Sequence, residues 1–572
     1  MLNKFKNTEK NINLKDINSL VELFFLRLKI SDKKEIFLES LNQNYSKQKY
    51  TWEEVANKIF KVSSKIKSFI KNGDRCLLLS ENRPEWLILD IAIMNAGGIS
   101  VPVFTTYSED DYKYIINDCK PALIIVSNNN QFKKIKNYID HETKNIISFE
   151  EINHKSNLIE DIYREQSFEK VINYNLERRS VACIIYTSGT SGNPKGVMLS
   201  HGGILSNCSG ALEVLNPLIT KKKLIFLTWL PLSHSYEHTV QFIQILLGAK
   251  IFYAENLEKL ILNMSKAKPT IMTAVPRFYQ NLFNKINLNF RKQKGIKKLL
   301  IYQTLQLGKK ILNKKKLNFK ESFLNIFCNI LVRRKIKKQF GGNLKAFISG
   351  GGALDQNIGE FLNAIGLPTL QGYGLTEASP VVSCNLPGHI KVDTVGPAFK
   401  TNKVKIASDG EILIKGENVM LGYWNKKKET EDIIKNGWLH TGDIGEIDSE
   451  GFLKITDRKK DLIVNFGGDN ISPVKIENLL CLNENIKQSF VYGDKKNYLI
   501  AILVVEKNFT TQDLIVKYID NLNKKLSSIE KIKKFFVSFN EFTIENRMLT
   551  PTLKLRRKEI VINYLEQIKN LY

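Results

Sequence analysis

The sequence predicts an α/β protein with a large N-terminal domain, made of two layered α/β subdomains and a small β-subdomain, followed by a small α+β C-terminal domain. Three observations support this fold class. The chain has 572 residues, which is too long for one hydrophobic core. Short apolar runs alternate with amphipathic helical stretches through its first part, a pattern typical of parallel sheets covered by helices. After about Val392 the pattern changes to paired runs around turns, which is typical of β-hairpins.

The predicted strands of the first part are short apolar runs that begin at Cys76, Ala122, Val181, Leu224, Lys250, Thr270 and Lys345. Their length favours buried, largely parallel strands. In the later part, two pairs of runs flank the turns at 408–410 and 448–450, which predicts an antiparallel subdomain. We place the domain boundary at Asp457, where a basic run leads into a tail with helices and strands of its own. The predicted domains are therefore 1–456 and 457–572.

The composition is that of an ordinary globular protein and limits the classes of function. Hydrophobic residues make up 43% and charged residues 25%, which excludes disordered, collagen-like and disulfide-scaffold classes. There are 85 basic and 58 acidic residues, giving a formal net charge of +27. Such a surplus suggests nucleic acid or an anionic membrane as a partner. Because lysine is used throughout the chain without one stripe, we favour a compositional origin and predict no nucleic-acid partner.

The cysteines and the N-terminus predict a cytoplasmic location. Seven cysteines are scattered without a CxxC pair, which favours reduced thiols over a disulfide framework. The first residues lack the apolar core of a secretory signal. The most apolar long stretch, 86–104, contains Asp90, Asn95, Gly97 and Gly98, so we expect a buried helix followed by a strand instead of a membrane span. Peripheral contact with the inner face of a membrane stays open.

A basic helical insertion is predicted at about residues 284–340. It contains the runs KQKGIKK, GKKILNKKK and VRRKIKK. Two interpretations stay open for it: a helical surface that contacts an anionic membrane, or the solvated faces of ordinary helices. The second is the more common fate of such charge runs.

The strongest local motif is the loop that follows the predicted strand at Val181. It reads YTSGTSGNPKGV from Tyr186 to Val197. Glycines allow backbone N–H groups to approach phosphate oxygens, hydroxyl groups add donors, and Lys195 adds a positive charge. The loop is not a Walker motif, which requires GK[ST] at the start of a helix. We predict a phosphate-binding loop formed by Thr187, Ser188, Gly189, Thr190, Ser191, Gly192 and Lys195.

This loop resembles the phosphate-binding loop of the acyl-adenylate-forming (AMP-binding) enzymes, which include acyl-CoA synthetases, luciferases and peptide-synthetase adenylation domains. Four further segments resemble motifs of the same superfamily in the expected order. They are an acyl-site segment at 230–238, an adenine and metal segment at 371–377, a ribose segment at 438–443 and a hinge at Asp457-Arg458. The resemblance extends from about Thr51 to Lys558. Because five ordered motifs are much more specific than one, it implies the fold and the chemistry of this superfamily.

The resemblance implies a nucleotide site built from several of these segments. A glycine turn after the strand at Lys345 offers an open backbone to a flat ring, and Tyr373 would form the other side of the adenine pocket. Asp443 would accept hydrogen bonds from the ribose, and Arg458 would donate to it. A core aromatic and a surface ion pair are the alternatives for Tyr373 and for the Asp–Arg pair. The predicted nucleotide-binding set also includes Gly351, Gly352, Ala353, Gln371, Gly372, Gly374 and Thr376.

The resemblance also implies a metal and an acyl site. Glu377 would bind Mg²⁺ with an oxygen ligand, together with Thr187, and Thr376 would donate to a phosphate. His234 would lie beside the acyl carboxylate and is predicted to be catalytic with Thr376, whereas a satisfied core histidine is the alternative.

The catalytic lysine of the superfamily lies near the C-terminus and often follows a glycine. Lys554 is the matching residue here, although Leu553 takes the place of that glycine. The resemblance implies a mobile C-terminal domain that rotates about the hinge at Asp457. One orientation would present Lys554, and the other would place Gly467 and Gly468 along a channel for coenzyme A. Lys459 is a second departure, since many members have an apolar residue there.

The predicted function is ATP- and Mg²⁺-dependent activation of a long-chain fatty acid to acyl-AMP, followed by transfer to coenzyme A. The ENRPEW segment (81–86), the helical insertion and the segment 332–355 resemble long-chain fatty acyl-CoA synthetases. An acyl carrier protein as the acceptor is the nearest alternative. A non-catalytic nucleic-acid or membrane-binding protein is a distant one, supported only by the net charge. The sequence leaves monomer and homodimer open.

Overall fold

Two eight-stranded sheets form the framework of the N-terminal domain. The computed structural model describes residues 12–45, 49–139, 145–187, 193–220, 222–459, 461–467, 469–483, 485–506, 512–550 and 553–572. In sheet order, the first sheet contains β15 (Val381–Cys384), β14 (Thr369–Gly374), β13 (Ala346–Ser349), β12 (Ile271–Ala274), β10 (Ile225–Thr228), β11 (Lys250–Tyr253), β1 (Ile36–Ser40) and β2 (Lys49–Thr51). The second contains β18 (Gly422–Tyr423), β9 (Lys195–Ser200), β8 (Val181–Thr187), β4 (Ile99–Val103), β3 (Arg75–Leu79), β5 (Leu123–Val126), β6 (Ile146–Ser148) and β7 (Asn157–Leu158).

The inner strands of both sheets are parallel, as the apolar runs predict. In the first sheet β1, β11, β10, β12, β13 and β14 pair in parallel, and antiparallel pairing occurs only at β2 and β15 among the described residues. In the second sheet β9 and β18 add an antiparallel edge to β8. Parallel neighbours end on the same side of a sheet, so the segments that follow β12, β13 and β14 are close together.

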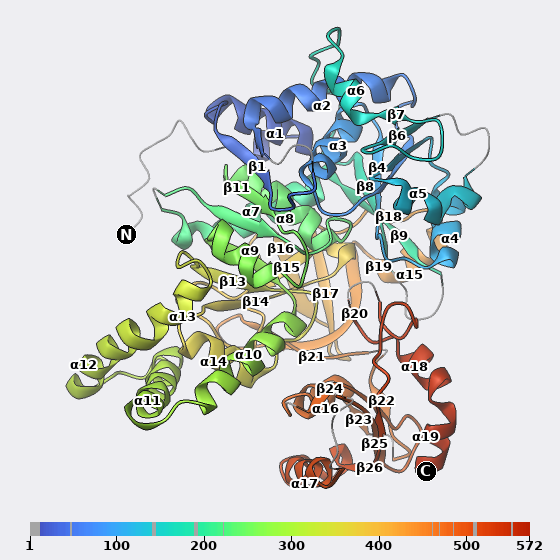
Figure 1. Ribbon diagram of the computed structural model, residues 1–572. Helices are drawn as coiled ribbons and strands as arrows, with labels where there is room; N and C mark the ends of the chain where they lie inside the picture. The colour runs from blue at the N-terminus through green and yellow to red at the C-terminus, as the bar shows by residue number, and fades with distance from the viewer. Residues whose placement is uncertain are drawn as a thin grey trace.

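A layer of helices shared by the two sheets forms the largest core. It contains α1 (Leu20–Ile30), α2 (Trp52–Lys67), α3 (Pro84–Asn95), α7 (His201–Leu215) and α8 (Ser235–Leu246), which pack with strands of both sheets (Figure 1). Every residue of α3 and α8 is buried. The stretch 86–104 therefore forms a buried helix followed by β4, as predicted. No helix within the described parts of the chain is long and apolar enough to span a membrane.

Helices α4 (Glu109–Cys119) and α5 (Asn129–Ile135) pack on the outer face of the second sheet, and α9 (Leu260–Ala267) and α14 (Gln356–Ala364) pack on that of the first. Helix α6 (Ile159–Arg164) packs against α2, and α15 (Lys427–Ile433) lies against β18 and β20. The predicted insertion is helical and connects β12 to β13. It consists of α10 (Pro276–Arg291), α11 (Gly295–Leu312), α12 (Phe319–Cys328), a π-helical turn (Asn329–Arg333) and α13 (Arg334–Gln339). Figure 1 shows α11 and α12 projecting from the body, on the side away from α19.

The predicted antiparallel subdomain is a five-stranded sheet. Its strands are β16 (Asn402–Ile406), β17 (Glu411–Gly416), β19 (Ile434–Lys435), β20 (Trp438–Ile447) and β21 (Leu453–Arg458). Both predicted hairpins are present, since β16 pairs with β17 and β20 with β21. The predicted boundary residue Asp457 lies within β21, where it pairs with Ile444.

The C-terminal part is a small α+β unit, as predicted. A three-stranded sheet and a short hairpin carry four helices, and Figure 1 shows this unit beside the ends of β20 and β21. The elements are β22 (Ile463–Val464), β23 (Asn470–Ile471), α16 (Pro473–Leu480), β24 (Ile486–Tyr492), β25 (Leu499–Val505), α17 (Gln512–Asn523), β26 (Ile532–Ser538), α18 (Arg557–Asn563) and α19 (Leu565–Leu571). The seven cysteines all lie within the described residues, and none of them forms a disulfide.

Candidate active site

The ends of the phosphate-loop hairpin lie next to the predicted metal ligand. Thr187 at the end of β8 pairs with Lys195 at the start of β9, so the two ends of the loop are fixed to each other. The residues between them, Ser188, Gly189, Thr190, Ser191 and Gly192, lie outside the described residues. The Nζ of Lys195 lies 4.9 Å from the centre of the Tyr423 ring. The hydroxyl of Tyr423 donates to Oε1 of Glu377 at 2.8 Å, which connects the loop to the metal segment.

Glu377 fits the role of a magnesium ligand. Its Oε1 is held by Tyr423, whereas Oε2 makes no hydrogen bond among the described residues. No cluster of three or more His, Cys, Asp or Glu side chains suited to a metal ion occurs in the described part of the chain. Mg²⁺ usually binds one or two carboxylates together with the phosphates of a substrate, so a single oriented carboxylate beside a phosphate loop suits it.

The acyl-site segment contacts the metal segment through a hydroxyl pair that the sequence did not predict. Oγ of Ser235, at the start of α8, lies 3.0 Å from Oγ1 of Thr376, and both residues are buried. Thr376 stands in a short 3-10 helix (Thr376–Ala378) directly after β14. This contact fixes two of the predicted catalytic segments relative to each other.

His234 caps α8 at the edge of the same site. Its Nδ1 accepts a hydrogen bond from the backbone N–H of Tyr236 at 3.2 Å, which fixes the orientation of the ring. Burial, together with the charge of Lys554, lowers the pKa of His234 from 6.5 to about 4. The imidazole is therefore neutral near pH 7, and its unprotonated form is the one that would face a carboxylate substrate.

The glycine turn after β13 is open on one side and tightly packed on the other. Gly351, Gly352 and Ala353 are exposed, and Gly351 has a φ of +81°, a backbone conformation that favours glycine. At Gly350 an added Cβ would lie 2.9 Å from the ring of Tyr236. The turn therefore packs against the ring of Tyr236 on one side. Its backbone is accessible on the other side, as the predicted adenine contact requires.

Strand β14 carries the other side of the predicted adenine pocket. Tyr373 lies within this strand. The side chain of Gln371 is engaged by protein groups: its Oε1 accepts from Leu354 N–H, and its Nε2 donates to the carbonyl of Val392. A contact of Gln371 with a nucleotide would therefore use its backbone. At Gly374 an added Cβ would lie 1.9 Å from the carbonyl oxygen of Pro380, so no larger side chain fits. At Gly372 an added Cβ would lie 3.1 Å from the carbonyl oxygen of Ser383, which is also a tight contact.

Three predicted nucleotide residues meet at Asp443. The hydroxyl of Tyr373 donates to its Oδ2 at 2.6 Å, and Nε of Arg458 lies 3.1 Å from its Oδ1. The register of the β20–β21 hairpin explains this geometry, because Asp443 and Arg458 are direct cross-strand partners. Burial raises the pKa of Asp443, and the Arg458 guanidinium opposes that effect. The cluster presents acceptors and donors suited to ribose hydroxyl groups.

Lys554 lies within electrostatic reach of this cluster. Burial within the surrounding protein and the charge of Arg458 lower the pKa of its ammonium group, whereas Asp443 and Glu377 act in the opposite direction. Its charge also reaches His234. The loop is closed by two hydrogen bonds, from Lys554 N–H to Oγ1 of Thr550 and from Thr550 N–H to the carbonyl of Lys554. Leu553 has a φ of +62°, so it adopts the left-handed conformation that a glycine would favour.

The hinge segment is tied to the β-subdomain. The backbone N–H of Lys459 donates to the carbonyl of Gly442, and its Nζ lies 2.7 Å from Oδ2 of Asp409 and 3.5 Å from Oε2 of Glu411. Glu411 also accepts from Gly442 N–H at 2.8 Å. The unusual residue Lys459 therefore links the start of the C-terminal part to strand β17 by an ion pair.

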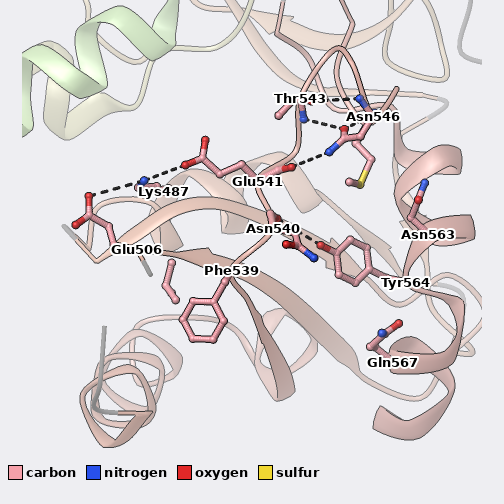
Figure 2. Close-up of a pocket in the computed structure, with 12 residues that line it drawn as sticks. Lys487, Glu506, Phe539, Asn540, Glu541, Thr543, Asn546, Asn563, Tyr564 and Gln567 are labelled. Carbon is pink, nitrogen blue, oxygen red and sulfur yellow. Dashed lines mark hydrogen bonds and ion pairs between the residues drawn. The ribbon is translucent and has the colours of Figure 1, made fainter. Parts of the chain in front are cut away.

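One of the two glycines that were predicted to line a coenzyme A channel lies within the described residues. Gly467 is exposed in the turn of the β22–β23 hairpin, where Asp469 N–H donates to Oδ1 of Asn465. Gly468 lies outside the described residues. Figure 2 shows a separate cavity of about 880 Å³ in the C-terminal part, lined by Lys487, Glu541, Asn546, Tyr564 and other residues, none of which is a predicted site residue.

Ser235 and Tyr423 are the two positioning residues that the sequence analysis missed. Ser235 lies inside the acyl-site segment 230–238, directly after His234. The signal that could have identified it is a hydroxyl group at the N-terminus of a helix. Tyr423 gave no comparable signal, because its contact with Glu377 depends on the pairing of β18 with β9.

Comparisons with known proteins identify the family of the chain. Residues 32–424 match the family of AMP-binding enzymes, and residues 460–572 match the AMP-binding enzyme C-terminal domain. The chain is 28% identical over 556 residues to long-chain-fatty-acid–CoA ligase FadD15 of Mycobacterium bovis, covering 91% of this chain and 92% of that protein. It is also 28% identical over 625 residues to long-chain-fatty-acid–CoA ligase 5 of Rattus norvegicus, covering 97% and 89%.

A solved structure shows the same fold. O-succinylbenzoate coenzyme A synthetase from Bacillus subtilis, in complex with ATP and magnesium ion, superposes with a TM-score of 0.69 at 22% identity, covering 94% of this chain and 98% of that one. Since the first family match alone spans more than half of the sequence, the chain belongs to the family of AMP-binding enzymes.

Proposed function

We propose that this protein joins a long-chain fatty acid to coenzyme A in two steps that share one site. A carboxylate oxygen of the acid attacks the α-phosphorus of ATP, the bond to the β-phosphate oxygen breaks, and acyl-AMP and pyrophosphate form. The thiol of coenzyme A then attacks the acyl carbonyl, loses its proton, and AMP leaves. The observation that carries this proposal is the meeting of Tyr373 and Arg458 at Asp443, a carboxylate that also acts on the charge of Lys554.

The residues of this chain would act in adenylation by binding and by charge. Asp443 and Arg458 would hold the ribose, and the turn at Gly351 would face the adenine across from Tyr373. Lys554 would donate to the phosphate and carboxylate oxygens where negative charge develops. Glu377 would hold Mg²⁺, which neutralises phosphate charge when bound.

A rotation of the C-terminal part about the predicted hinge at Asp457 would serve the second step. In the orientation described here the charge of Lys554 reaches Glu377, Asp443 and His234, whereas the hairpin of Gly467 makes its contacts within its own part of the chain. This orientation suits adenylation. Thioester formation would need the hairpin to approach the site, while water stays excluded from the mixed anhydride.

The substrate class and the acceptor are finer parts of the proposal. Two relatives that match most of the chain carry the name of long-chain-fatty-acid–CoA ligase, which supports a long acyl chain and coenzyme A. Acyl carrier protein is the second candidate acceptor, because the net charge of +27 suits an acidic carrier. We also keep the predictions of a cytoplasmic location, of peripheral contact with an anionic membrane, and of a monomer or a homodimer.

The test is mass spectrometry of the products. Purified protein is incubated with Mg-ATP and fatty acids from butyrate to stearate, with coenzyme A, with acyl carrier protein, or with neither. Long-chain acyl-CoA and AMP are the expected products. Acyl-AMP that accumulates with coenzyme A but is consumed by the carrier protein would assign the second acceptor. The absence of both acyl-AMP and thioester would contradict the proposed function.

A further inference from the structure

The helical insertion carries the densest group of exposed large apolar side chains in the described part of the chain. On α12 and the π-helical turn they include Phe319, Phe323, Ile326, Phe327 and Ile330, which we call the outer face of α12. Phe319 is 89% exposed and Phe323 60%. Single exposed apolar residues are common on proteins, but a continuous group marks an interaction surface.

The outer face of α12 points away from the body of the protein. Its residues recur at helical spacing along one side of the helix, whereas Cys328, on the opposite side, is buried. The rings of Phe323 and Phe327 contact each other edge to face, with centroids 5.1 Å apart. The helix therefore uses one side for packing within the insertion and leaves a separate apolar side uncovered.

A buried arginine holds this helix in place by hydrogen bonds to its neighbours. Arg333, in the π-helical turn, donates from Nε to the carbonyl of Ala364, from Nη1 to Oδ1 of Asn325, and from Nη2 to the carbonyl of Thr304. These bonds connect α12 to α11 and α14. At Gly308 an added Cβ would lie 2.5 Å from the backbone of Ala364, so α11 and α14 are also in close contact. The apolar side chains are thus presented on a fixed support.

The outer face is bordered by positive charge. From residue 309 to 338 there are eleven Lys or Arg residues and a single acidic one, Glu321, which is paired with Lys310. Six of these cations are exposed and make neither an ion pair nor a side-chain hydrogen bond among the described residues: Lys315, Lys316, Lys320, Arg334, Lys335 and Lys338. An apolar face flanked by unpaired cations matches the chemistry of an anionic lipid surface, with apolar tails below and negative headgroups above.

We propose that the outer face of α12 docks on an anionic lipid bilayer. The aromatic and aliphatic side chains enter the boundary between headgroups and acyl chains, and the flanking lysines contact the headgroups. Nucleic acid is a poorer match, since a duplex would satisfy the charges but leave the three phenylalanines in water. Burying each phenylalanine and neutralising each lysine both favour the membrane.

The position of the insertion explains what the lipid contact would do for the enzyme, and this explanation rests on the proposed function. Helix α10 begins at Pro276, and the Cβ position of Gly352 in the predicted adenine turn is 3.5 Å from that proline ring. The insertion thus begins beside the predicted adenine turn, and its helix α12 carries the proposed lipid contact. An enzyme that activates fatty acids would gain by holding its site near the phase in which long-chain acids dissolve.

The test measures vesicle binding of the full-length protein without ATP or substrate. Binding is measured by flotation with vesicles of phosphatidylcholine mixed with phosphatidylglycerol and with pure phosphatidylcholine. We expect binding to the anionic vesicles only. Phe319→Ser/Phe323→Ser and Lys315→Glu/Lys316→Glu should each weaken it at least roughly tenfold. Since all four residues are exposed, both variants should keep the wild-type rate on a water-soluble octanoate substrate.

Two matched controls distinguish binding through this face from nonspecific hydrophobic binding and from the effect of net charge. Leu257→Ser removes another strongly exposed apolar residue, and Lys33→Glu/Lys34→Glu changes the net charge equally at an exposed loop. Both should bind vesicles like the wild type. The proposal is overturned if wild-type protein does not float with anionic vesicles, if the controls weaken binding as much as the α12 variants, or if binding is to DNA and survives Phe319→Ser/Phe323→Ser. None of these outcomes depends on ligase activity, so they are distinct from a failure of the proposed function.

Discussion

The nucleotide side and the lysine side of the candidate site are held in different ways. On the nucleotide side, Tyr373 and Arg458 both bond to Asp443, and the positions of Asp443 and Arg458 follow from strand register. On the lysine side, Lys554 stands in a short loop that is closed by two hydrogen bonds with Thr550. With the proposed function, this difference would place nucleotide binding in the N-terminal fold and its hinge, whereas the placement of the C-terminal part would deliver the adenylating charge.

The largest effect is expected from removing the lysine. Lys554→Ala should lower the rate of acyl-AMP formation by roughly 10²–10³-fold, the scale for losing one donor to a transition state. Thioester formation from supplied acyl-AMP should largely survive, because Lys554 would leave the site for that step. Rapid-quench measurement of the two half-reactions checks this. An equal loss in both would remove the distinction between the two sides.

A smaller effect is expected from the nucleotide side. Asp443→Asn removes the carboxylate that Arg458 and Tyr373 share, so the guanidinium loses its ionic partner. We expect a roughly tenfold to hundredfold weaker Kd for ATP, measured by calorimetry. Tyr373→Phe is the matched control, since it keeps the ring and removes only the hydroxyl; its effect should stay within about fivefold. If both half-reactions were unimpaired at saturating and at low ATP, Asp443 would have no role in binding.

The strained loop offers a way to strengthen the lysine side. Leu553 pays roughly 1–2 kcal/mol for its left-handed backbone, and glycine would avoid this cost. Leu553→Gly should slow hydrogen exchange at the Thr550 amide by roughly fivefold to thirtyfold, because the closed loop becomes more stable. Leu553→Ala is the control that loses the side chain and keeps the strain. Identical exchange in the glycine and alanine variants would show that backbone strain is not stored there.

The ion pair at the hinge should have a modest effect. Lys459 binds Asp409 and Glu411, and exposed pairs contribute at most about 1 kcal/mol. Lys459→Met should therefore raise the ratio of thioester formation to adenylation by less than about fivefold, by loosening the orientation described here. Lys454→Met breaks a pair with Glu446 inside the β20–β21 hairpin and should leave the ratio unchanged. A lower ratio for Lys459→Met would contradict the idea that the pair favours adenylation.

The finest test is the titration of His234. Its pKa is lower in the folded chain than in the unfolded one, so the native state binds fewer protons; its contribution to stability is complete above pH 6.5 and is lost as the pH falls toward about 4. Lys554→Met should shift the pKa upward but leave it below 6.5, because burial is the larger cause. Histidine NMR resonances, with His234→Asn for assignment, report this. An unchanged pKa would mean that Lys554 does not lie close to His234.

The sequence predicted the fold and the motif residues, because apolar runs and ordered motifs are local signals. Tyr373, Asp443 and Arg458 could each be named, and the β20–β21 hairpin that aligns two of them could be foreseen from its turn. The Ser235–Thr376 and Tyr423–Glu377 contacts could not, since they join segments far apart in the chain. The engagement of the Gln371 side chain by backbone groups was missed for the same reason. The exposure of the apolar face of α12 could be recognised only from the tertiary packing, because a helix with the same spacing of apolar residues could equally have that face buried.

The most direct test of the account is the affinity of the Lys554→Ala variant for Mg-ATP, measured by isothermal titration calorimetry without a fatty acid. If nucleotide binding is built into the N-terminal side and the hinge, Kd should stay within about fivefold of the wild-type value although adenylation is nearly abolished. A Kd weakened roughly a hundredfold or more would show that the lysine creates the nucleotide site, and it would contradict the division between the two sides.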